Sequence, residues 1–156
     1  MSPPPVEADL GVLLAACCER VVREVLGELS VVGYGHLTPS QSLAVLFIGE
    51  GLDTVTQLAD RLGMTTQAIS KICAALAADG LLERQPNEGD ARSRRLTLTG
   101  EGVRAVEAMR AAGKAAERAW LDLVGTETLE VVRGALAKFA FAPPPAVASA
   151  VRIRFS

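Results

Sequence analysis

Apolar residues recur every three or four positions along most of the chain, the spacing of one face of an α-helix. The first such stripe predicts a helix from about Val6 to Val32, after the prolines at positions 3–5. Two further stripes predict helices over residues 102–124 and 126–141. The stripes are Leu10, Leu14, Cys17, Val21, Val25 and Leu29; then Val103, Val106, Gly113, Ala116, Trp120 and Leu123; and finally Leu129, Val132, Leu136 and Phe139. The chain is therefore predicted to be mainly α.

Capping signals divide the middle of the chain into short helices. The stretches from Thr38 to Gln41 and from Thr54 to Gln57 have the spacing of a capping box, in which two side chains satisfy free backbone N–H groups. The second of these helices is expected to stop at Gly63. The next begins after Thr65 or Thr66 and runs to Gly80. Two helices joined by so tight a turn predict a helix-turn-helix.

The helix after this turn has two distinct faces. Its buried side is expected to hold Ile69, Ile72, Cys73 and Leu76. The opposite side carries Thr66, Gln67, Ser70, Lys71 and Ala74. Short polar side chains on an outward face can read base edges and phosphates in a major groove. A solvated helix face would show the same pattern, so this helix alone does not decide between the two.

A β-hairpin is predicted after the helix-turn-helix. Residues 81–87 and 94–99 form its strands, with Leu96 and Leu98 on one side, and the polar segment 88–93 forms its loop. A helix-turn-helix followed by a hairpin makes a winged helix. The fold class expected is therefore mainly α with a small β-hairpin wing.

Positive charge gathers at this wing although the chain as a whole is acidic. The 156 residues carry a formal charge of −2, yet Arg92, Arg94 and Arg95 lie within four positions. A local basic patch makes nucleic acid a candidate partner. A solvated, charged loop is the alternative.

Residues 54–102 resemble the DNA-binding module of the MarR (multiple antibiotic resistance regulator) family. The likeness rests on the helix opening "TTQAISK", the exit "DGLLER", and a wing with Asp90 and Arg92 before a strand that ends Leu98-Thr99. The resemblance implies a homodimeric regulator, by family habit a repressor, on pseudo-palindromic double-stranded DNA. It implies Arg92 in the minor groove, oriented by Asp90. The residues implied at the major groove are Thr66, Gln67, Ser70 and Lys71, and Arg94 and Arg95 complete the predicted DNA contacts, with unequal parts if the strand alternates.

The terminal helices support a dimer, because they hold more apolar surface than a small winged helix can cover. An enlarged monomer core is the alternative. We therefore expect an N-terminal dimerisation helix over residues 6–34, a winged helix-turn-helix over 38–100, C-terminal dimerisation helices over 101–141, and a tail over 142–156. The tail departs from the family pattern, and its structure is left open.

Signal sensing is less well marked in the sequence. The resemblance implies a small phenolic or lipophilic effector between the dimer helices and the winged helix, where Tyr34 and His36 would lie, although ordinary surface positions explain both. Some relatives sense oxidants through a first-helix cysteine. Cys17 and Cys18 lie in that region, but no histidine or lysine stands beside them, and a packed structural thiol is the favoured reading.

Other function classes find little support. With one histidine and no glycine-rich phosphate loop, the chain offers no set of catalytic residues, so we expect neither an enzyme nor a cofactor. Cys73 has no nearby ligand partner, so we expect no metal site. No apolar run reaches membrane-spanning length and no signal peptide is visible, so a cytoplasmic location is expected. The remaining alternatives are a winged helix used for protein–protein contact and a thiol-based redox sensor.

Overall fold

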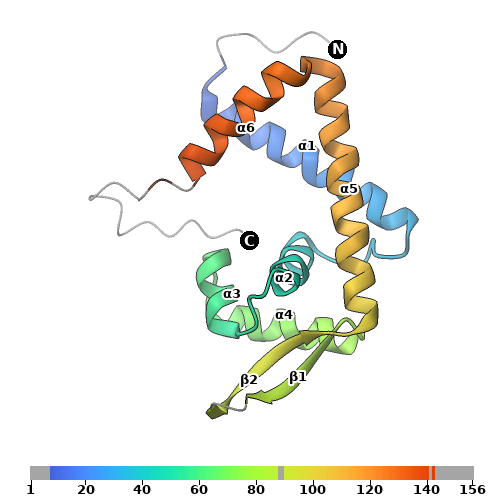
Figure 1. The fold of residues 1–156 in the computed structure, drawn as a ribbon, viewed down its shortest axis with the longest axis vertical. Coiled ribbons are helices and arrows are strands. Elements are labelled where there is room, and N and C mark those ends of the chain that lie inside the picture. The colour runs from blue at the N-terminus through green and yellow to red at the C-terminus, as the bar shows by residue number, and fades with distance from the viewer. Residues whose placement is uncertain (1–7, 88–89, 141, 143–156) are drawn as a thin grey trace.

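In the computed structural model, residues 8–87, 90–140 and 142 are described, and they form six helices and one hairpin (Figure 1). In chain order the elements are α1 (Leu10–Val31), α2 (Pro39–Gly49), α3 (Val55–Leu62), α4 (Thr66–Ala78), β1 (Leu82–Asn87), β2 (Asp90–Leu98), α5 (Gly100–Val124) and α6 (Thr126–Ala140). The strands are antiparallel neighbours in a two-stranded sheet. The expectation of a mainly α chain with a small β-hairpin is confirmed.

The elements form two lobes joined by α5. The wing lobe comprises α2, α3, α4, β1 and β2, and the helical lobe comprises α1, α5 and α6 (Figure 1). In the view of Figure 1, α5 rises from the hairpin to the opposite end of the molecule, where α6 folds back across α1. The N-terminal half of α5 buries Ala105, Val106 and Met109 in the same core as the wing lobe. One long helix therefore carries the wing lobe and continues into the helical lobe.

The helix starts follow the capping residues. Both predicted capping boxes form, from Thr38 to Gln41 and from Thr54 to Gln57. Thr65 is the residue that caps α4, where its hydroxyl accepts a hydrogen bond from the Ala68 N–H. Side-chain oxygens at these positions satisfy backbone N–H groups that the first turn leaves free.

The predicted start of the first helix at Val6 is wrong. The carboxylate of Asp9 accepts a hydrogen bond from the Gly11 N–H at 2.8 Å and caps a helix that begins at Leu10. An aspartate at this position satisfies the free N–H groups better than a continued turn would. The predicted end of the last helix at Phe141 lies outside the described residues, as does all of the tail except Ala142.

The hairpin is longer than predicted. Leu82 pairs with Leu98 and Pro86 with Arg94, but Asn87 pairs with Asp90, so the register shifts between Pro86 and Asn87. The segment 88–93 was predicted to be loop throughout, whereas β2 already begins at Asp90. A bulge-like shift accommodates extra residues on one strand while pairing continues. Polar composition alone could not reveal this pairing.

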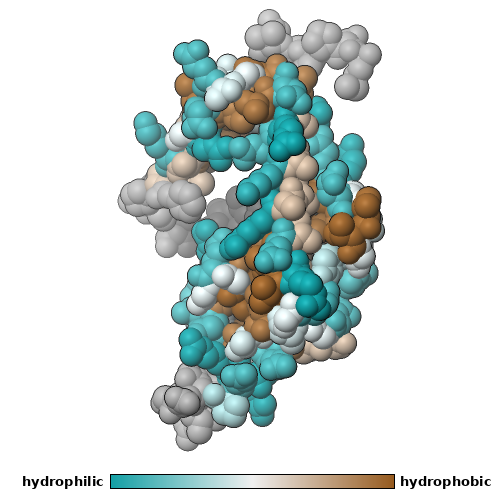
Figure 2. Space-filling model, turned by 45° about the vertical axis from the view of Figure 1, so that its right-hand side comes forward, coloured by the Kyte–Doolittle hydropathy of each residue, from teal (hydrophilic) through white to brown (hydrophobic). Residues whose placement is uncertain are grey.

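Large apolar side chains stay exposed along the helical lobe. They include Leu10, Val12, Leu14, Val31, Val32, Val103, Leu123, Val124, Val131, Leu136 and Phe139. Figure 2 shows hydrophobic side chains gathered at the end of the molecule where α5 and α6 meet.

Among the described residues, no helix has the length and apolar character needed to cross a membrane.

Candidate nucleic-acid interface

Helix α4 presents the polar face that its sequence predicts. Ile69, Cys73 and Leu76 are fully buried against the wing lobe, which fixes the rotation of the helix about its own axis. The predicted outward residues are placed accordingly: Thr66, Gln67, Lys71 and Ala74 are exposed, and Ser70 is half-buried. Gln and Lys side chains on such a face can reach base edges, and Ser and Thr hydroxyls can reach bases or phosphates.

The turn between α3 and α4 is fixed by its glycine. Gly63 has φ +64°, in the left-handed region that favours glycine, and it closes α3. The Met64 N–H then donates to the Ala59 carbonyl at 3.0 Å. This short turn sets the angle at which α4 leaves α3, as in a helix-turn-helix.

Arg84 of β1 is a site residue that sequence reasoning missed. Its guanidinium donates to the backbone carbonyl of Ser70, in the middle of α4, at 3.0 Å. Arg84 therefore ties the wing to the helix that presents the polar face. Burial raises the pKa of the neighbouring Cys73 thiol, and the positive charge of Arg84 opposes this increase in part. A neutral, buried thiol is a packing group rather than a reactive one.

The three wing arginines are in different situations. The side chain of Arg94 is exposed. The Nε of Arg95 lies 2.6 Å from an Oδ of Asp53, in the segment between α2 and α3. Asp90 and Arg92 belong to the backbone of β2, but their side chains fall outside what the structure describes. Arg95 therefore has a carboxylate partner within its own chain. The unequal parts of Arg94 and Arg95 in DNA binding stay a prediction.

A cavity of about 440 Å³ lies beside this ion pair. It is lined by Ile48, Gly51, Asp53, Gln85, Arg95, Leu96, Thr97 and Leu98. The walls come from the end of α2, the segment before α3, and both strands of the wing. An open cleft thus separates the wing from the helices at this point. The Asp53–Arg95 ion pair joins the two sides of this cleft.

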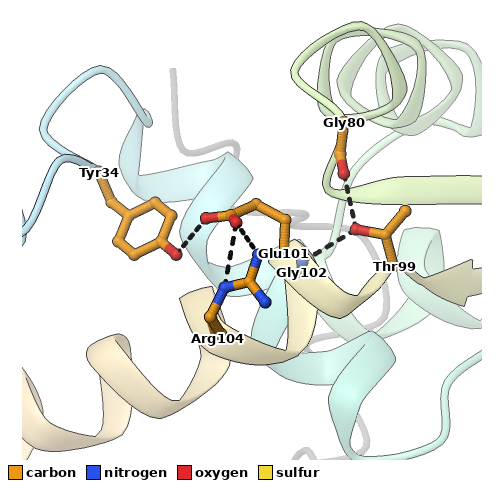
Figure 3. A network of polar contacts seen from close by, with 6 residues as sticks. All are labelled: Tyr34, Gly80, Thr99, Glu101, Gly102 and Arg104. Atoms are coloured by element: carbon orange, nitrogen blue, oxygen red, sulfur yellow. Dashed lines mark hydrogen bonds and ion pairs between the residues drawn. The ribbon is translucent and has the colours of Figure 1, made fainter.

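Tyr34 and His36, the candidate effector residues, contact residues of other elements. The Tyr34 hydroxyl donates to the Glu101 carboxylate at 2.5 Å, and that carboxylate also pairs with Arg104 (Figure 3). The hydrogen bond to Glu101 and partial burial raise the pKa of Tyr34, while the same bond lowers the pKa of Glu101. His36 Nε2 lies 3.8 Å from an Asp79 carboxylate oxygen at the end of α4. These two residues connect the α1–α2 loop to α5 and α4.

A second set of contacts joins the exit of α4 to the start of α5. The Thr99 hydroxyl donates to the Gly80 carbonyl at 2.6 Å and accepts from the Gly102 N–H at 3.0 Å (Figure 3). A Cβ atom at Gly102 would overlap the carbonyl oxygen of Leu81, so this position requires glycine. These contacts join the end of α4 to the start of α5, the helix that leads into the other lobe.

The helical lobe holds an apolar cavity of about 300 Å³ between α1, α5 and α6. Its lining comprises Val21, Gly113, Ala116, Glu117, Trp120, Leu129, Val132, Arg133 and Leu136. Arg133 pairs with Glu117 at 2.5 Å across its rim. On α1, Cys17 is half-buried and Cys18 is exposed. Among the described residues, no cluster of three or more His, Cys, Asp or Glu side chains could hold a metal ion.

Comparison with known proteins gives a consistent result. A model of the MarR family matches residues 37–93. The exopolysaccharide II synthesis transcriptional activator ExpG of Rhizobium meliloti (strain 1021) is 33% identical over 110 residues, which cover 68% of this chain and 57% of ExpG. The chain therefore spans less than two thirds of the length of that relative.

Solved structures share the whole architecture. A probable transcriptional regulator from Pseudomonas aeruginosa superposes with a TM-score of 0.70 at 26% identity, covering 86% of this chain and 99% of that one. Bordetella bronchiseptica BpsR, whose DNA binding is regulated by 6-hydroxynicotinic acid, gives a TM-score of 0.70 at 19% identity, covering 91% and 100%. The likeness to BpsR shows the fold alone.

Proposed function

The chain belongs to the MarR family, and from this premise we propose that it binds double-stranded DNA as a homodimeric transcriptional regulator. The observation that carries the proposal is the exposed polar face of α4. This face stands opposite three fully buried side chains and is tied to the wing by the Arg84 contact. A helix held in this way can enter a major groove without losing its own packing.

Base reading is assigned to α4. Gln67 is exposed near its N-terminal end, and an exposed glutamine can pair bidentately with adenine. Thr66, Ser70 and Lys71 flank it on the same face and reach bases or phosphates. The N-terminal turn of a recognition helix is the part that commonly meets base edges.

The wing supplies the second contact. Arg92 is assigned to the minor groove beside the bound major groove, with Asp90 orienting it, and Arg94 to the phosphate backbone. Arginine is favoured in a narrow minor groove because the negative potential there is enhanced. The support is the position of both residues on β2, at the far end of the hairpin from the α5 junction.

Dimerisation is assigned to the helical lobe. Phe139 is 81% exposed and Leu123 is 68% exposed, and most of the other large exposed apolar side chains lie on the same three helices. Exposed apolar patches of this kind usually mark an interface. Two-fold pairing of the helical lobe would present two α4 helices to the half-sites of a pseudo-palindromic operator.

Repression with release by a small molecule completes the proposal. A dimer that covers promoter DNA would exclude other proteins from it, whereas ExpG carries the name of an activator. A small lipophilic or phenolic effector would act at the junction of the lobes, where the Tyr34–Glu101–Arg104 contacts lie. A ligand that binds better to one arrangement of the lobes shifts the population towards that arrangement.

Footprinting of the purified protein on the DNA upstream of its own coding region tests the proposal. We expect a protected pseudo-palindrome with half-sites separated by about one helical turn. Light scattering should show a dimer at micromolar concentration. A monomer in solution, or the absence of protection at low salt, would overturn the corresponding part of the proposal.

A further inference from the structure

Asp53 and Arg95 form a direct side-chain contact between the wing and the segment that precedes α3. The carboxylate of Asp53 is about one quarter exposed, and the Arg95 side chain is 62% exposed. Their atoms meet at 2.6 Å, although 42 positions separate them in the sequence. Arg95 was predicted as a DNA contact, but its Nε donor is directed to this carboxylate.

Backbone contacts hold Asp53 in place for this role. Its carbonyl accepts a hydrogen bond from the Leu96 N–H of β2 at 2.7 Å. Its own N–H donates to the Gln57 side chain at 3.1 Å, and Gln57 belongs to the capping box of α3. Asp53 therefore binds β2 through both its side chain and its backbone, while α3 fixes it from the other side.

The position of the pair along the hairpin indicates what it does. Arg95 lies opposite Gln85 in the register, and the neighbouring Leu96 is buried in the core. The wing extends away from this point towards Asp90, and the cavity of about 440 Å³ lies beside it. The pair thus holds the hairpin near its middle, and together with the Arg84–Ser70 contact it sets the angle between the wing and α4.

From these contacts we infer that Asp53 and Arg95 are positioning residues, which set the wing for DNA binding without touching DNA themselves. The inference rests on the proposed DNA-binding function and assigns Arg95 a role different from that of Arg94. The Asp53 carboxylate holds the Nε of Arg95, and strand pairing holds its backbone. Asp53, which is acidic and would otherwise repel phosphates, becomes necessary for tight binding.

The two possible roles of Arg95, DNA contact and positioning residue, predict opposite changes in operator affinity for one substitution at Asp53. Asp53→Asn removes a negative charge and keeps the side-chain shape. If Arg95 were a DNA contact restrained by Asp53, this variant would bind operator more tightly. If the pair positions the wing, affinity should fall by about two- to five-fold, the range expected for one partly exposed ion pair.

Asp60→Asn is the matched control, because it makes the same charge change at an exposed position on α3. This control should bind operator at least as tightly as wild type. Arg95→Gln should weaken binding yet leave the salt dependence unchanged, since each lost phosphate contact would reduce the slope by about 0.9. The double variant Asp53→Asn/Arg95→Gln should bind no more weakly than Arg95→Gln alone.

Amide hydrogen exchange of the DNA-free protein gives an independent readout. The Leu96 amide should exchange faster in Asp53→Asn than in Asp60→Asn. Tighter or unchanged operator binding by Asp53→Asn, a reduced salt slope in Arg95→Gln, or equal Leu96 exchange would each overturn the inference. If wild type fails to bind any operator, the proposed function fails, but the exchange experiment still decides whether the pair holds the wing.

Discussion

Most of the large apolar side chains that stay exposed lie in the helical lobe and not in the wing lobe. In the wing lobe, Leu58 and Leu76 are completely buried, whereas in the helical lobe Leu10 is 70% exposed and Leu123 is 68% exposed. Burying a leucine side chain contributes about 1.5–3 kcal/mol relative to leaving it in water. The wing lobe gains this stabilisation within one chain. A single chain does not gain it at Leu10 and Leu123, which is why dimerisation is proposed for this lobe.

The difference arises from the arrangement of the helices. Around the wing lobe, α2, α3, α4, the hairpin, the start of α5 and the end of α1 share a common core. In the helical lobe, the far half of α5 packs against α1 and α6, where Ala116 and Leu129 are buried while Leu123, Val124 and Val131 stay exposed. A second copy of the chain would complete this half-covered layer.

Removing buried volume from the wing lobe should have the largest effect. Leu76→Ala should lower the free energy of unfolding by about 2–5 kcal/mol, because it leaves a cavity in a closed core. Leu123→Ala is the matched control and should change the stability of the monomer by only about 0.5 kcal/mol. Urea unfolding followed by circular dichroism at low protein concentration measures both. Equal losses would show that the lobes do not differ in this way.

Adding a charge to the exposed apolar surface should have the next largest effect. Phe139→Glu should weaken dimerisation by about 2–4 kcal/mol, the loss expected if this exposed aromatic side chain is a main contact of the proposed interface. Phe139→Leu keeps the apolar character and should largely preserve the dimer. Analytical ultracentrifugation over a range of concentrations provides the measurement. A wild-type monomer, or a Phe139→Glu dimer of normal affinity, would leave the exposed surface without its proposed partner.

Substitutions at the residues proposed to contact DNA should have smaller effects. Their effects on operator affinity and on sequence discrimination should be separable. Arg92→Ala should cost about 1–3 kcal/mol of operator affinity and leave the fold intact. Gln67→Ala should instead reduce the discrimination between operator and scrambled DNA. Fluorescence anisotropy titrations of both duplexes at two salt concentrations distinguish these outcomes. Wild-type binding by Arg92→Ala would favour a winged helix that contacts proteins rather than DNA.

The contact between the lobes should give the smallest effect. Tyr34→Phe removes the hydroxyl that donates to Glu101. This variant should lose only a small fraction of the free energy of unfolding that Leu76→Ala loses. The pKa of Tyr34 is raised from 10.0, so its contribution is present below pH 10 and is lost as the pH rises through the folded-state value. The pKa of Glu101 is lowered from 4.5, so its contribution is present above pH 4.5 and is lost on further acidification.

Thermal unfolding between pH 3 and 11 tests this last prediction. The difference between wild type and Tyr34→Phe should be greatest at neutral pH and should shrink towards both ends of the range. A difference that does not change with pH would mean that the hydroxyl acts through packing and not through its hydrogen bond to Glu101.

Local sequence signals predicted most of the fold because they act within one turn of helix. Thr38 and Thr54 each have a glutamine three residues later, and this spacing predicted the start of a helix. Both capping boxes are confirmed. The start at Asp9 was missed because the apolar stripe and the prolines before it suggested an earlier start. Polar composition likewise concealed the first residues of β2, because strand pairing depends on a partner rather than on composition.

The candidate site was predictable only in part. Helical spacing alone placed Gln67 and Lys71 on the exposed face of α4. The bond from Arg95 to Asp53 and the bond from Arg84 to Ser70 join distant positions, and no local pattern encodes them. A charged residue in a strand has the same appearance in a sequence whether it faces phosphate or a carboxylate of its own chain. The roles of Asp90 and Arg92 remain predictions.

The packing of α1 against α5 has a consequence for how the chain is made. Residues 32–99 are synthesised after α1 and before the helix against which it packs. At about 5–20 residues per second, α1 emerges from the ribosome and waits roughly 3–14 s for that partner. During this interval the side chain of Leu29, which is fully buried in the folded chain, is open to any other apolar surface. A chaperone that binds apolar segments would protect α1 until α5 is complete.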